Sequence, residues 1–555
     1  MPRLYPRGTL RIYFIIGLVI AVLCMVSYHR SIASTIALSF GSLGKTASSL
    51  FSTTTASSPF RMSAAKKKPV IVVGSGFAGL SAAYEALKAG ARVHMLERAA
   101  KPGGNSIKAS SGINGAGTRF QRSAGIAKDE SFYDDTVRSA GERLQAGPAG
   151  VDRTALIETL TARSAAAVDW LVDEIGLDLS VVAMLGGHSV ARTHRGASGP
   201  PPGAAIVSTL LKKLNENPDY ELTTSANVDA LLSTPDGAVT GVRYTITTEG
   251  KGEEQHQQKT TTHELSGPVV FAAGGFAGDA HGLLARHRPD LAGMPSTNEA
   301  RPAPHGLLAN DALGVALVDM QSVQVHPTGF VDPATAGAAY KILAAEALRG
   351  EGGILLHAAT GARFVDELQT RDVVSAAIMG LPPAEDGRGD TRQWDVSLLL
   401  DPGACEAAAS HLSFYLWKGL MRKVKVRDLP PAVVAAVDAY AAAVADGEDR
   451  AFGRRSFGRW RLPPGEANRD QEVCVGRVTP VVHFTMGGAA FDVRARVLAR
   501  KRDGEALRPV PGLWAAGEIT GGVHGANRLG GSSLLECAVF GRIAGREAAG
   551  SLDES

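Results

Sequence analysis

Three glycines near residue 75 have the type and spacing of a phosphate-binding turn. Gly74, Gly76 and Gly79 form the pattern G-x-G-x-x-G, and Glu97 follows them. In such a pattern the first glycine permits a tight turn, the second lets a pyrophosphate approach the backbone, and the third lets a helix pack closely on a strand. The free N–H groups of that helix can bind the phosphates, and the acid can accept hydrogen bonds from a ribose diol. These residues predict a dinucleotide-binding site.

The elements needed to position these glycines are predicted in the right order. Val70–Val73 is a short apolar run rich in β-branched residues, which predicts a buried strand. Apolar residues at helical spacing follow, and Gly90 ends the predicted helix. Arg92–Leu96 predicts a second strand, with Glu97 at its end. Strand, helix, strand and acid together make a more specific signal than a glycine-rich turn in an unrelated α/β domain.

The bulk composition is that of a globular protein of at least two domains. The chain has 555 residues, of which 45% are hydrophobic and 20% charged, and its net charge of +3 gives no reason to expect nucleic acid as a partner. The cysteines at positions 24, 405, 474 and 537 form no C-x-x-C pattern. The sequence therefore offers no iron–sulfur cluster, c-type haem or disulfide framework, and no metal site is expected.

Residues 1–65 are predicted to be a targeting or membrane-anchor segment and linker. Basic residues precede an apolar run over Ile12–Val26, which could extend to residue 28, and no acidic residue occurs before Glu85. Three interpretations remain open, namely a signal anchor, a cleaved signal peptide and a mitochondrial presequence. We expect delivery to the mitochondrion or the endoplasmic reticulum, with membrane anchoring through residues 12–28 as one form. A shorter soluble form could start at Met62.

The glycine-rich pattern at both ends of the chain predicts one domain made from two segments. Small residues are dense over 101–117 and again from Val481 onward, while 326–480 differs and contains a predicted helix over Pro431–Ala445. We expect an α/β fold, with a Rossmann-like nucleotide-binding domain formed by 66–325 and 481–550. A capping α+β domain, 326–480, would be inserted into it. Further expectations are a helical stretch over Ser131–Trp170, a loop over 186–195 that carries His188 and Arg192, and β-hairpins over Tyr220–Leu265.

Seven short motifs occur in one order between Lys68 and the C-terminus. They are GSGFAGLSAA, HPTG, EALRG, TRD, HFTMGG, AAGE and GANRLGG. In these motifs and their order the chain resembles the flavoprotein of the fumarate reductase/succinate dehydrogenase family. The likeness is closest to the soluble, single-chain, FAD-dependent fumarate reductases of eukaryotes.

The resemblance implies FAD as the cofactor, bound in an extended form. It assigns the pyrophosphate to the three glycines and the adenosine ribose to Glu97. The other positions that match cofactor contacts of the family are Asn105, Ser106, Ser111, Gly112, Asn114, Ala273, Gly274, Asp311, Glu518, Ser533 and Leu534. In members from respiratory complexes, a histidine near this first loop bonds covalently to FAD. This chain has no histidine near Asn105 and Ser106, so we expect the flavin to be non-covalent.

An unsaturated dicarboxylate would need cations at both ends, a hydride donor on one face and a proton donor on the other. Arginine suits carboxylates because its planar fork binds them through two hydrogen bonds. The resemblance assigns the carboxylate clamp to His326, His483 and Arg528, each in a glycine- or proline-containing loop of the kind that often presents functional groups. It adds Gly112 and Thr485 as further substrate contacts.

The resemblance also assigns the proton donor to Arg371, the arginine of TRD. An arginine acid is unusual because its pKa exceeds about 12, but nearby positive charge and a relay base can assist it. Glu346 and Arg349 lie three residues apart and hence on one helical face. They match the family's relay from Arg349 through Glu346 to Arg371. The alternative for this pair is a structural ion pair on a solvated helix.

One departure from the family pattern affects the expected substrate. Many members carry a threonine before the relay glutamate, and here that position is Ala345. The resemblance implies hydride transfer from reduced flavin to fumarate, giving succinate, with reduced flavin or an unidentified protein as electron donor. Two alternatives stay open. One is the reduction of another 2-enoate, for which Ala345 is the reason, and the other is a membrane-tethered flavin protein that relays electrons.

Overall fold

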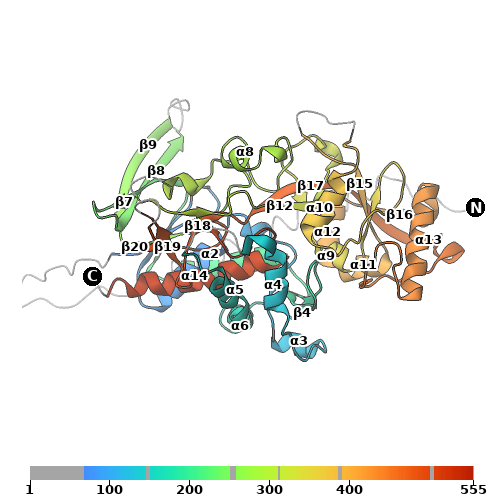
Figure 1. Cartoon of the computed structure of the whole chain (residues 1–555), viewed down its shortest axis with the longest axis horizontal. Coiled ribbons are helices and arrows are strands. Elements are labelled where there is room, and N and C mark those ends of the chain that lie inside the picture. Colours follow the sequence, from blue (N-terminus) through green and yellow to red (C-terminus); the bar gives the residue numbers. More distant parts are fainter. Residues whose placement is uncertain are drawn as a thin grey trace, which may run out of the picture. The chain divides into compact units, whose positions relative to one another are not determined.

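The computed structural model describes residues 68–144, 150–249, 258–309, 313–384, 391–500 and 505–553. The N-terminal segment, with its predicted anchor at 12–28, lies outside these residues. Residues 67–555 form one compact unit (Figure 1). Among the helices of the described ranges, none combines the length and the apolar character needed to span a bilayer.

A six-stranded sheet receives strands from both ends of this unit. Its order is β19-β20-β10-β1-β2-β6, in which β19 is antiparallel to β20 and all other neighbours are parallel. The bounds are β1 Val70–Val73, β2 Val93–Leu96, β6 Tyr220–Thr223, β10 Val269–Phe271, β19 Arg496–Ala499 and β20 Arg508–Ala515. The predicted strand, helix and strand are confirmed, with α2 running over Phe77–Lys88. The α/β fold is therefore confirmed too.

The central strand is buried on both faces, which explains its apolar run. Val70 and Val72 belong to one hydrophobic cluster with α2, whereas Ile71 and Val73 belong to a second cluster on the other face of the sheet. A parallel strand that is covered on both faces has apolar residues at consecutive positions, whereas a strand covered on one face has them at alternate positions. The β-branched residues of the sequence thus position the turn that follows β1.

The last helix packs directly on the first helix of the described chain. α14 runs over Ser532–Gly550 and contacts α2 along its length. A Cβ added at Gly541 would lie 2.5 Å from the Ala78 carbonyl oxygen, and one at Gly545 would lie 2.1 Å from that of Ala82. Only glycine permits so close an approach of two helix backbones. The C-terminal segment is held in this way beside the glycine turn.

The predicted helical stretch over Ser131–Trp170 is three α-helices. They are α4 Phe132–Ala140, α5 Arg153–Ala162 and α6 Ser164–Asp173, with α3 Arg119–Ser123 before them and α7 Pro202–Asn215 after them. α4 ends at Gly141, whose φ is +58°. The side chain of Asp152 accepts a hydrogen bond from the Ala155 N–H and starts α5. Local capping thus divides a run that periodicity alone predicts as continuous.

The predicted hairpins over Tyr220–Leu265 are present, with one correction. β7 Ala226–Ser233, β8 Val239–Glu249 and β9 Gln258–Ser266 form an antiparallel sheet, visible in green in Figure 1. The segment Tyr220–Thr223, however, is β6, which pairs in parallel with β2 at the edge of the main sheet. An isolated short strand carries no sign of its partner, so the sequence could not separate it from the hairpins.

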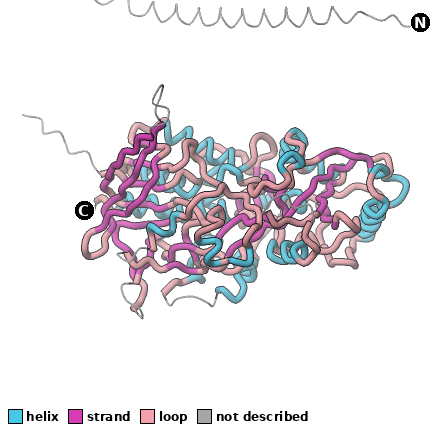
Figure 2. Tube along the Cα trace, turned by 90° about the horizontal axis from the view of Figure 1, so that it is seen from above, coloured by secondary structure: helices cyan, strands magenta, loops and turns pink. Residues whose placement is uncertain are grey.

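A second, antiparallel sheet holds the middle of the chain. Its order is β13-β12-β17-β15-β14, with β16 also pairing with β17. Figure 2 draws all strands of the described chain in magenta. The bounds are β12 Val323–Phe330, β13 Ile342–Leu343, β14 Ile354–His357, β15 Val396–Leu400, β16 Arg422–Lys425 and β17 Glu472–Thr485. Its helices are α9 Ala347–Gly350, α10 Arg371–Met379, α11 Pro402–Ala407, α12 Ala409–Trp417 and α13 Pro431–Asp446. Residues 67–555 form a single compact unit, and no division at 326 or 480 separates them. The predicted domain bounds of 326 and 480 therefore remain a prediction.

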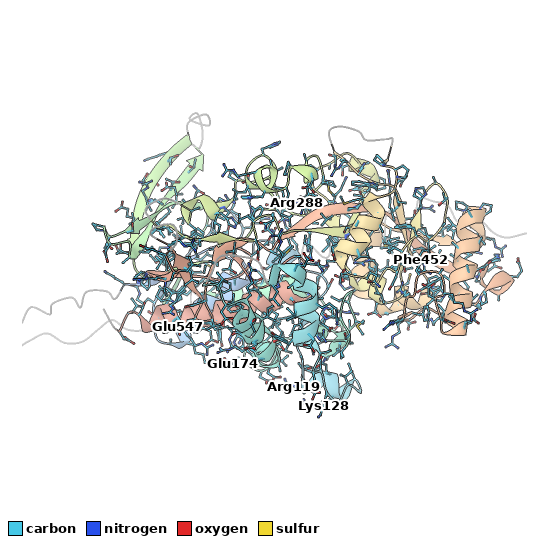
Figure 3. The ribbon with its side chains drawn as sticks, viewed as in Figure 1. Arg119, Lys128, Glu174, Arg288, Phe452 and Glu547 are labelled. Atoms are coloured by element: carbon cyan, nitrogen blue, oxygen red, sulfur yellow. The ribbon has the colours of Figure 1, made fainter. Side chains whose placement is uncertain are left out.

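Smaller elements complete the described chain. Two three-stranded sheets have the orders β3-β5-β4 and β11-β18-β21. Their strands, with one further helix, are β3 Ile113–Asn114, β4 Val181–Ala183, β5 Thr193–Arg195, β11 Leu317–Val318, β18 Gly488–Ala490, β21 Thr520–Gly521 and α8 Leu283–His287. The predicted loop over 186–195 is therefore wrong for its last three residues, which pair with β3 and β4 as β5. Charges pair locally on the surface, as Glu174 does with Lys88 and Arg288 with Asp290. Glu174 and Arg288 are labelled in Figure 3. Exposed pairs contribute little, so the buried clusters carry the stability.

Candidate active site

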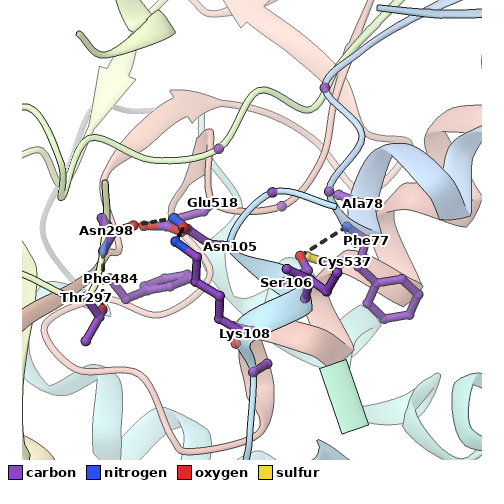
Figure 4. Close-up of a pocket in the computed structure, with 18 of the residues that line it drawn as sticks. Phe77, Ala78, Asn105, Ser106, Lys108, Thr297, Asn298, Phe484, Glu518 and Cys537 are labelled. Carbon is purple, nitrogen blue, oxygen red and sulfur yellow. Dashed lines mark hydrogen bonds between the residues drawn. The ribbon is translucent and has the colours of Figure 1, made fainter. Parts of the chain in front are cut away.

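A cavity of about 880 Å³ opens at the carboxyl ends of the parallel strands. Val73, Leu96 and Phe271, the last residues of β1, β2 and β10, all line it. Residues of the second sheet region, such as Tyr415 on α12 and Arg371 on α10, line it as well (Figure 4 shows part of the wall). Ligands of open α/β sheets bind at this edge, and a drug-sized cavity here is the default site.

Most of the predicted cofactor residues lie on the wall of this cavity. Those that line it are Gly74, Gly76, Glu97, Asn105, Ser106, Ser111, Gly112, Ala273, Gly274, Glu518, Ser533 and Leu534. Gly79 does not line it, and a Cβ there would lie 2.0 Å from the Gly74 carbonyl oxygen, in keeping with its predicted packing role. Asn114 lies behind the wall, where its side-chain amide donates to the Gly530 carbonyl. Asp311 is outside the described residues.

The glycine turn has the geometry that a pyrophosphate requires. Gly74 has a φ of +102°, and a Cβ on it would lie 2.4 Å from the Ala272 carbonyl oxygen. At Gly76 an added Cβ would meet nothing nearer than the Ser106 hydroxyl, at 3.6 Å, so the backbone faces open space. The hydroxyl of Ser106 accepts from the Phe77 N–H at 3.0 Å, at the start of α2 (Figure 4). The Glu97 carboxylate is oriented by the Ser75 N–H at 3.0 Å and the Ala99 N–H at 2.8 Å.

The loop beside this turn contains no histidine, as the sequence shows. In the structure the Asn105 amide instead donates to Asn298 (Figure 4). Histidines reach the cavity wall from other elements, His411 from α12 and His483 from β17. The ring of His411 is already engaged, since its Nε2 lies 2.6 Å from the Ser110 carbonyl oxygen. Non-covalent flavin remains a prediction.

Two arginines and two histidines from four separate segments lie on the cavity wall or directly behind it. Arg371, His483 and Arg528 line it, and the ring of His326 packs edge-on against that of His483 with 5.3 Å between centroids. His326 and His483 come from the paired strands β12 and β17, so the prediction that they lie in loops is wrong. Arg371 begins α10, and Arg528 follows a glycine-rich loop. His326, Arg371 and Arg528 are nearly or wholly excluded from solvent, and His483 is partly buried.

The predicted relay residues lie in the predicted order, and of the two arginines only Arg371 is hydrogen-bonded to Glu346. Nε of Arg371 donates to the Glu346 carboxylate at 2.7 Å, and its Nη2 donates to the same oxygen. On the other side, Nη2 of Arg349 lies 4.0 Å from the second Glu346 oxygen. All three side chains are buried, so the alternative of a solvated ion pair does not describe them.

Gln324 joins the two arginines of the site, and the sequence analysis missed it. Its side-chain oxygen accepts from Arg371 Nη1 at 2.7 Å and from Arg528 Nη2 at 3.0 Å. Its amide nitrogen donates to Asn527 at 2.8 Å and to the Arg528 carbonyl at 2.7 Å. The available signal was its place two residues before His326, because residues two apart share one face of a strand.

Burial and neighbouring charges set the protonation states of the site. Burial alone would raise the pKa of Glu346, but Arg371 and Arg349 outweigh it and lower that pKa to about 2. Burial and the adjacent arginines hold the pKa values of His326 and His483 well below their usual range. Burial and Arg371 lower the pKa of Arg528 to about 9. Near neutral pH the site therefore holds charged arginines, a charged Glu346 and two neutral imidazoles.

Of the two further residues predicted to bind substrate, Gly112 lines the cavity and Thr485 does not. Gly112 lines it, with a φ of +130° and no room for a side chain, since a Cβ would lie 2.4 Å from the His194 carbonyl oxygen. Thr485 does not line it, and its hydroxyl contacts Glu518 at 3.2 Å and the Phe276 N–H at 3.3 Å. Its role as a substrate contact remains a prediction.

Other wall residues were not found from the sequence. Phe484 lies against Arg528, whose guanidinium sits 4.2 Å from the ring centroid. Tyr415 lines the cavity, and its hydroxyl accepts from the N–H of Ala345 at 3.2 Å. Lys341 is a buried cation on the wall. The signal for Phe484 was its position next to His483, whereas nothing in the sequence distinguishes Lys341 from a surface lysine.

Comparisons with known proteins identify the family and the cofactor. A family model described as an FAD binding domain matches residues 69–534. Fumarate reductase 1 of Saccharomyces cerevisiae is 42% identical over 86% of this chain and 97% of that protein, and fumarate reductase of Schizosaccharomyces pombe is 37% identical over 89% and 91%. The open conformation of a flavocytochrome c3 fumarate reductase has a TM-score of 0.63 at 30% identity, covering 87% of this chain and 78% of that one. The chain thus belongs to the FAD-binding flavoprotein family of these fumarate reductases, with FAD as its cofactor.

Proposed function

We propose that this protein reduces fumarate to succinate. The observation that carries the proposal is Arg528, a buried guanidinium on the cavity wall that has no carboxylate partner among the described residues. Its Nε has no hydrogen-bond partner in that part of the chain either. An unpaired buried cation is costly, and an anionic substrate that binds it removes this cost.

The arrangement suits an anion with two carboxylates. Among the described residues, Arg371 pairs with the carboxylate of Glu346 alone, and Arg349 shares it. The three arginines around Gln324 and Glu346 therefore leave an excess of positive charge. His326 and His483 are held neutral, so a ring N–H of either can donate to a carboxylate without adding charge. Nδ1 of His326 accepts from the Thr328 N–H at 3.2 Å, which leaves the hydrogen of that ring on Nε2. Nε2 of His326 has no partner among the described residues. A small dianion can therefore be bound at both ends.

The reaction needs a hydride and a proton on adjacent carbons. Bound FAD, once reduced, supplies the hydride. Arg371 donates the proton, because it lines the cavity and is connected to a chain of groups that can restore its proton. Glu346, ionised at neutral pH, accepts a proton from Arg349 and passes it to Arg371. Gln324 holds Arg371 and Arg528 at a fixed separation, so that the substrate carboxylate and the proton donor keep their relative positions.

A second candidate substrate is another 2-enoate. The observation in its favour is Ala345, which is buried and offers only a methyl group where many relatives offer a hydroxyl. The electron donor is a separate question for either substrate. Reduced flavin or a partner protein would return the bound FAD to its reduced form after each turnover.

An anaerobic assay with purified protein tests the proposal. Reduced FMN serves as donor, and its oxidation is followed with fumarate and with mono-acids such as crotonate and acrylate. We expect rapid oxidation with fumarate and stoichiometric succinate. A faster reaction with a mono-acid would favour the second candidate, and no reaction with any enoate would leave only electron relay. The matched control is Arg371→Met, which should keep full FAD content and lose turnover.

A further inference from the structure

A loop outside the predicted catalytic residues contacts the relay carboxylate directly. The N–H of Gly186 donates to Oε1 of Glu346 at 2.9 Å. A Cβ at Gly186 would lie 2.6 Å from the Gln369 carbonyl oxygen and 3.0 Å from that Glu346 oxygen. Gly187 has a φ of +78°, which favours glycine as well. Two consecutive glycines are therefore needed for this loop to reach Glu346.

His188, the next residue, links this loop to a second one. Nη1 of Arg192 lies 2.7 Å from His188 Nδ1 and, as arginine can only donate, Nδ1 must accept. The hydrogen of a neutral ring is then on Nε2, which donates to the Gly530 carbonyl at 3.0 Å. Burial and the Arg192 charge lower the pKa of His188 to about 4, so this neutral tautomer prevails near neutral pH.

A buried ion network fixes Arg192 and, through it, the ring of His188. The guanidinium of Arg192 is fully buried and binds Asp129 at 2.8 Å and Asp135 at 2.7 Å. Asp135 also accepts from the Ser189 N–H at 2.8 Å, which ties the network back to the same loop. Groups held by several charged hydrogen bonds at once have little freedom to move.

Gly530 lies against both members of the proton-transfer pair. A Cβ on it would lie 2.7 Å from Oε2 of Glu346 and 3.2 Å from Nη2 of Arg371. It follows Arg528 by two residues, so its position also sets where that arginine presents its guanidinium. Its carbonyl has two donors, His188 and the amide of Asn114 at 2.8 Å.

We infer that His188 is a positioning residue for proton transfer, which holds Gly530, and with it Arg528, in register with Glu346 and Arg371. This inference rests on the proposed function, because the reaction that benefits is the reduction described above. His188 does not supply the proton itself. Its only described nitrogen contacts are Arg192 and the Gly530 carbonyl, neither of which is a proton source that leads to the substrate.

Two amide substitutions separate the two hydrogen bonds of the ring. The side-chain oxygen of His188→Asn can occupy the place of Nδ1 and accept from Arg192, but it leaves Gly530 without this donor. The amide nitrogen of His188→Gln can occupy the place of Nε2 and donate to Gly530. We expect kcat of the asparagine variant to fall about 10-fold to 100-fold with KM changed less than about threefold, since small misplacements cost that much. The glutamine variant should stay within about fivefold of wild type.

The experiment measures kcat and KM with reduced FMN and fumarate, FAD content, and thermal unfolding for both variants. The matched control is His263→Asn, the same change at an exposed histidine of β9. Equal kcat in the asparagine variant and the wild type would overturn the inference, and so would equal losses in the two variants. A glutamine variant more than about a thousandfold slower, yet folded and full of FAD, would identify His188 as a proton carrier instead.

Failure of the proposed function would be recognised separately. A wild-type protein that oxidises no reduced flavin with fumarate contradicts that proposal, whatever the variants do. The geometric part of the inference is then decided by ¹⁵N spectra of the histidine-labelled holoenzyme. The inference expects the signal of a neutral His188 ring with its hydrogen on Nε2. Both variants lack this histidine, so the disappearance of the signal in each of them assigns it to His188. A charged ring or the opposite tautomer at neutral pH would overturn it.

Discussion

Replacing Arg371 by lysine distinguishes a proton donor from a residue that only supplies positive charge. Arg371 uses three nitrogens at once, since Nε and Nη2 donate to Glu346 and Nη1 donates to Gln324. Lysine keeps the charge but presents one compact ammonium on a flexible stem, without the planar fork. It cannot maintain both partners and also point at the substrate. A charge-neutralising role would tolerate the change, and proton donation would not.

The expected loss follows from the contacts that disappear. A well-placed general acid contributes about 10²- to 10⁴-fold to rate. In Arg371→Lys both the orientation by Gln324 and the double contact to Glu346 are lost, so we expect kcat to fall at least about a thousandfold, or ~4 kcal/mol in the barrier. KM should change far less, because the proposed clamp of Arg528, His326 and His483 is left unchanged.

Steady-state kinetics under anaerobic conditions measure this, with FAD occupancy confirmed from absorbance beforehand. Glu346→Gln should behave similarly, because an amide cannot carry a proton from Arg349. Arg363→Lys is the matched control, an arginine in a buried ion pair with Glu367 that does not line the cavity. Retention of more than about a tenth of wild-type kcat in Arg371→Lys would refute the assignment, since such a residue is not the general acid.

Three further predictions address the substrate clamp, the cofactor and the N-terminus. Arg528→Met should lose about 2–4 kcal/mol in kcat/KM, partly through KM, without losing FAD; unchanged kinetics with fumarate would contradict the dicarboxylate assignment. Acid or heat denaturation should release FAD into the supernatant, because no histidine occupies the family's attachment position near Asn105; flavin that precipitates with the chain would show a covalent bond. A chain starting at Met62 should fold and stay active, whereas the full-length chain should be delivered to an organelle; failure of the shorter chain to fold would place residues 1–61 in the core.

The local parts of the fold were predictable because each depends on a short stretch of sequence. The run Val70–Val73, the glycine turn and α2 follow from apolar periodicity and from the needs of a tight turn. Long-range pairing was not predictable to the same extent. Nothing local indicates that Tyr220–Thr223 pairs in parallel with β2, whereas the neighbouring strands form hairpins. The helical run after Ser131 was predicted without its breaks, which depend on the conformation of Gly141 and the cap at Asp152.

The site required the resemblance as well as residue chemistry. His326, Arg371, His483 and Arg528 lie far apart in the sequence, and no spacing rule brings them together. The structure brings Arg371, His483 and Arg528 to the wall of one cavity, with His326 packed against His483. Gln324 was missed because a glutamine in an apolar strand is ordinarily explained by an exposed face. Its burial becomes understandable only when both arginines that it accepts from are placed beside it.

Two buried glutamates of the site illustrate why residue type alone does not determine a role. Burial raises the pKa of Glu518 to about 7, because its hydrogen bonds from Thr485 and the more distant charge of Arg528 do not compensate. Glu346 is equally buried, but its direct contacts with Arg371 and the nearby Arg349 reverse the effect. If Glu518 were as acidic as Glu346, its full negative charge would offset part of the charge of Arg528. Because it remains partly protonated near neutral pH, Arg528 keeps an unmet charge, and a dianion can bind there.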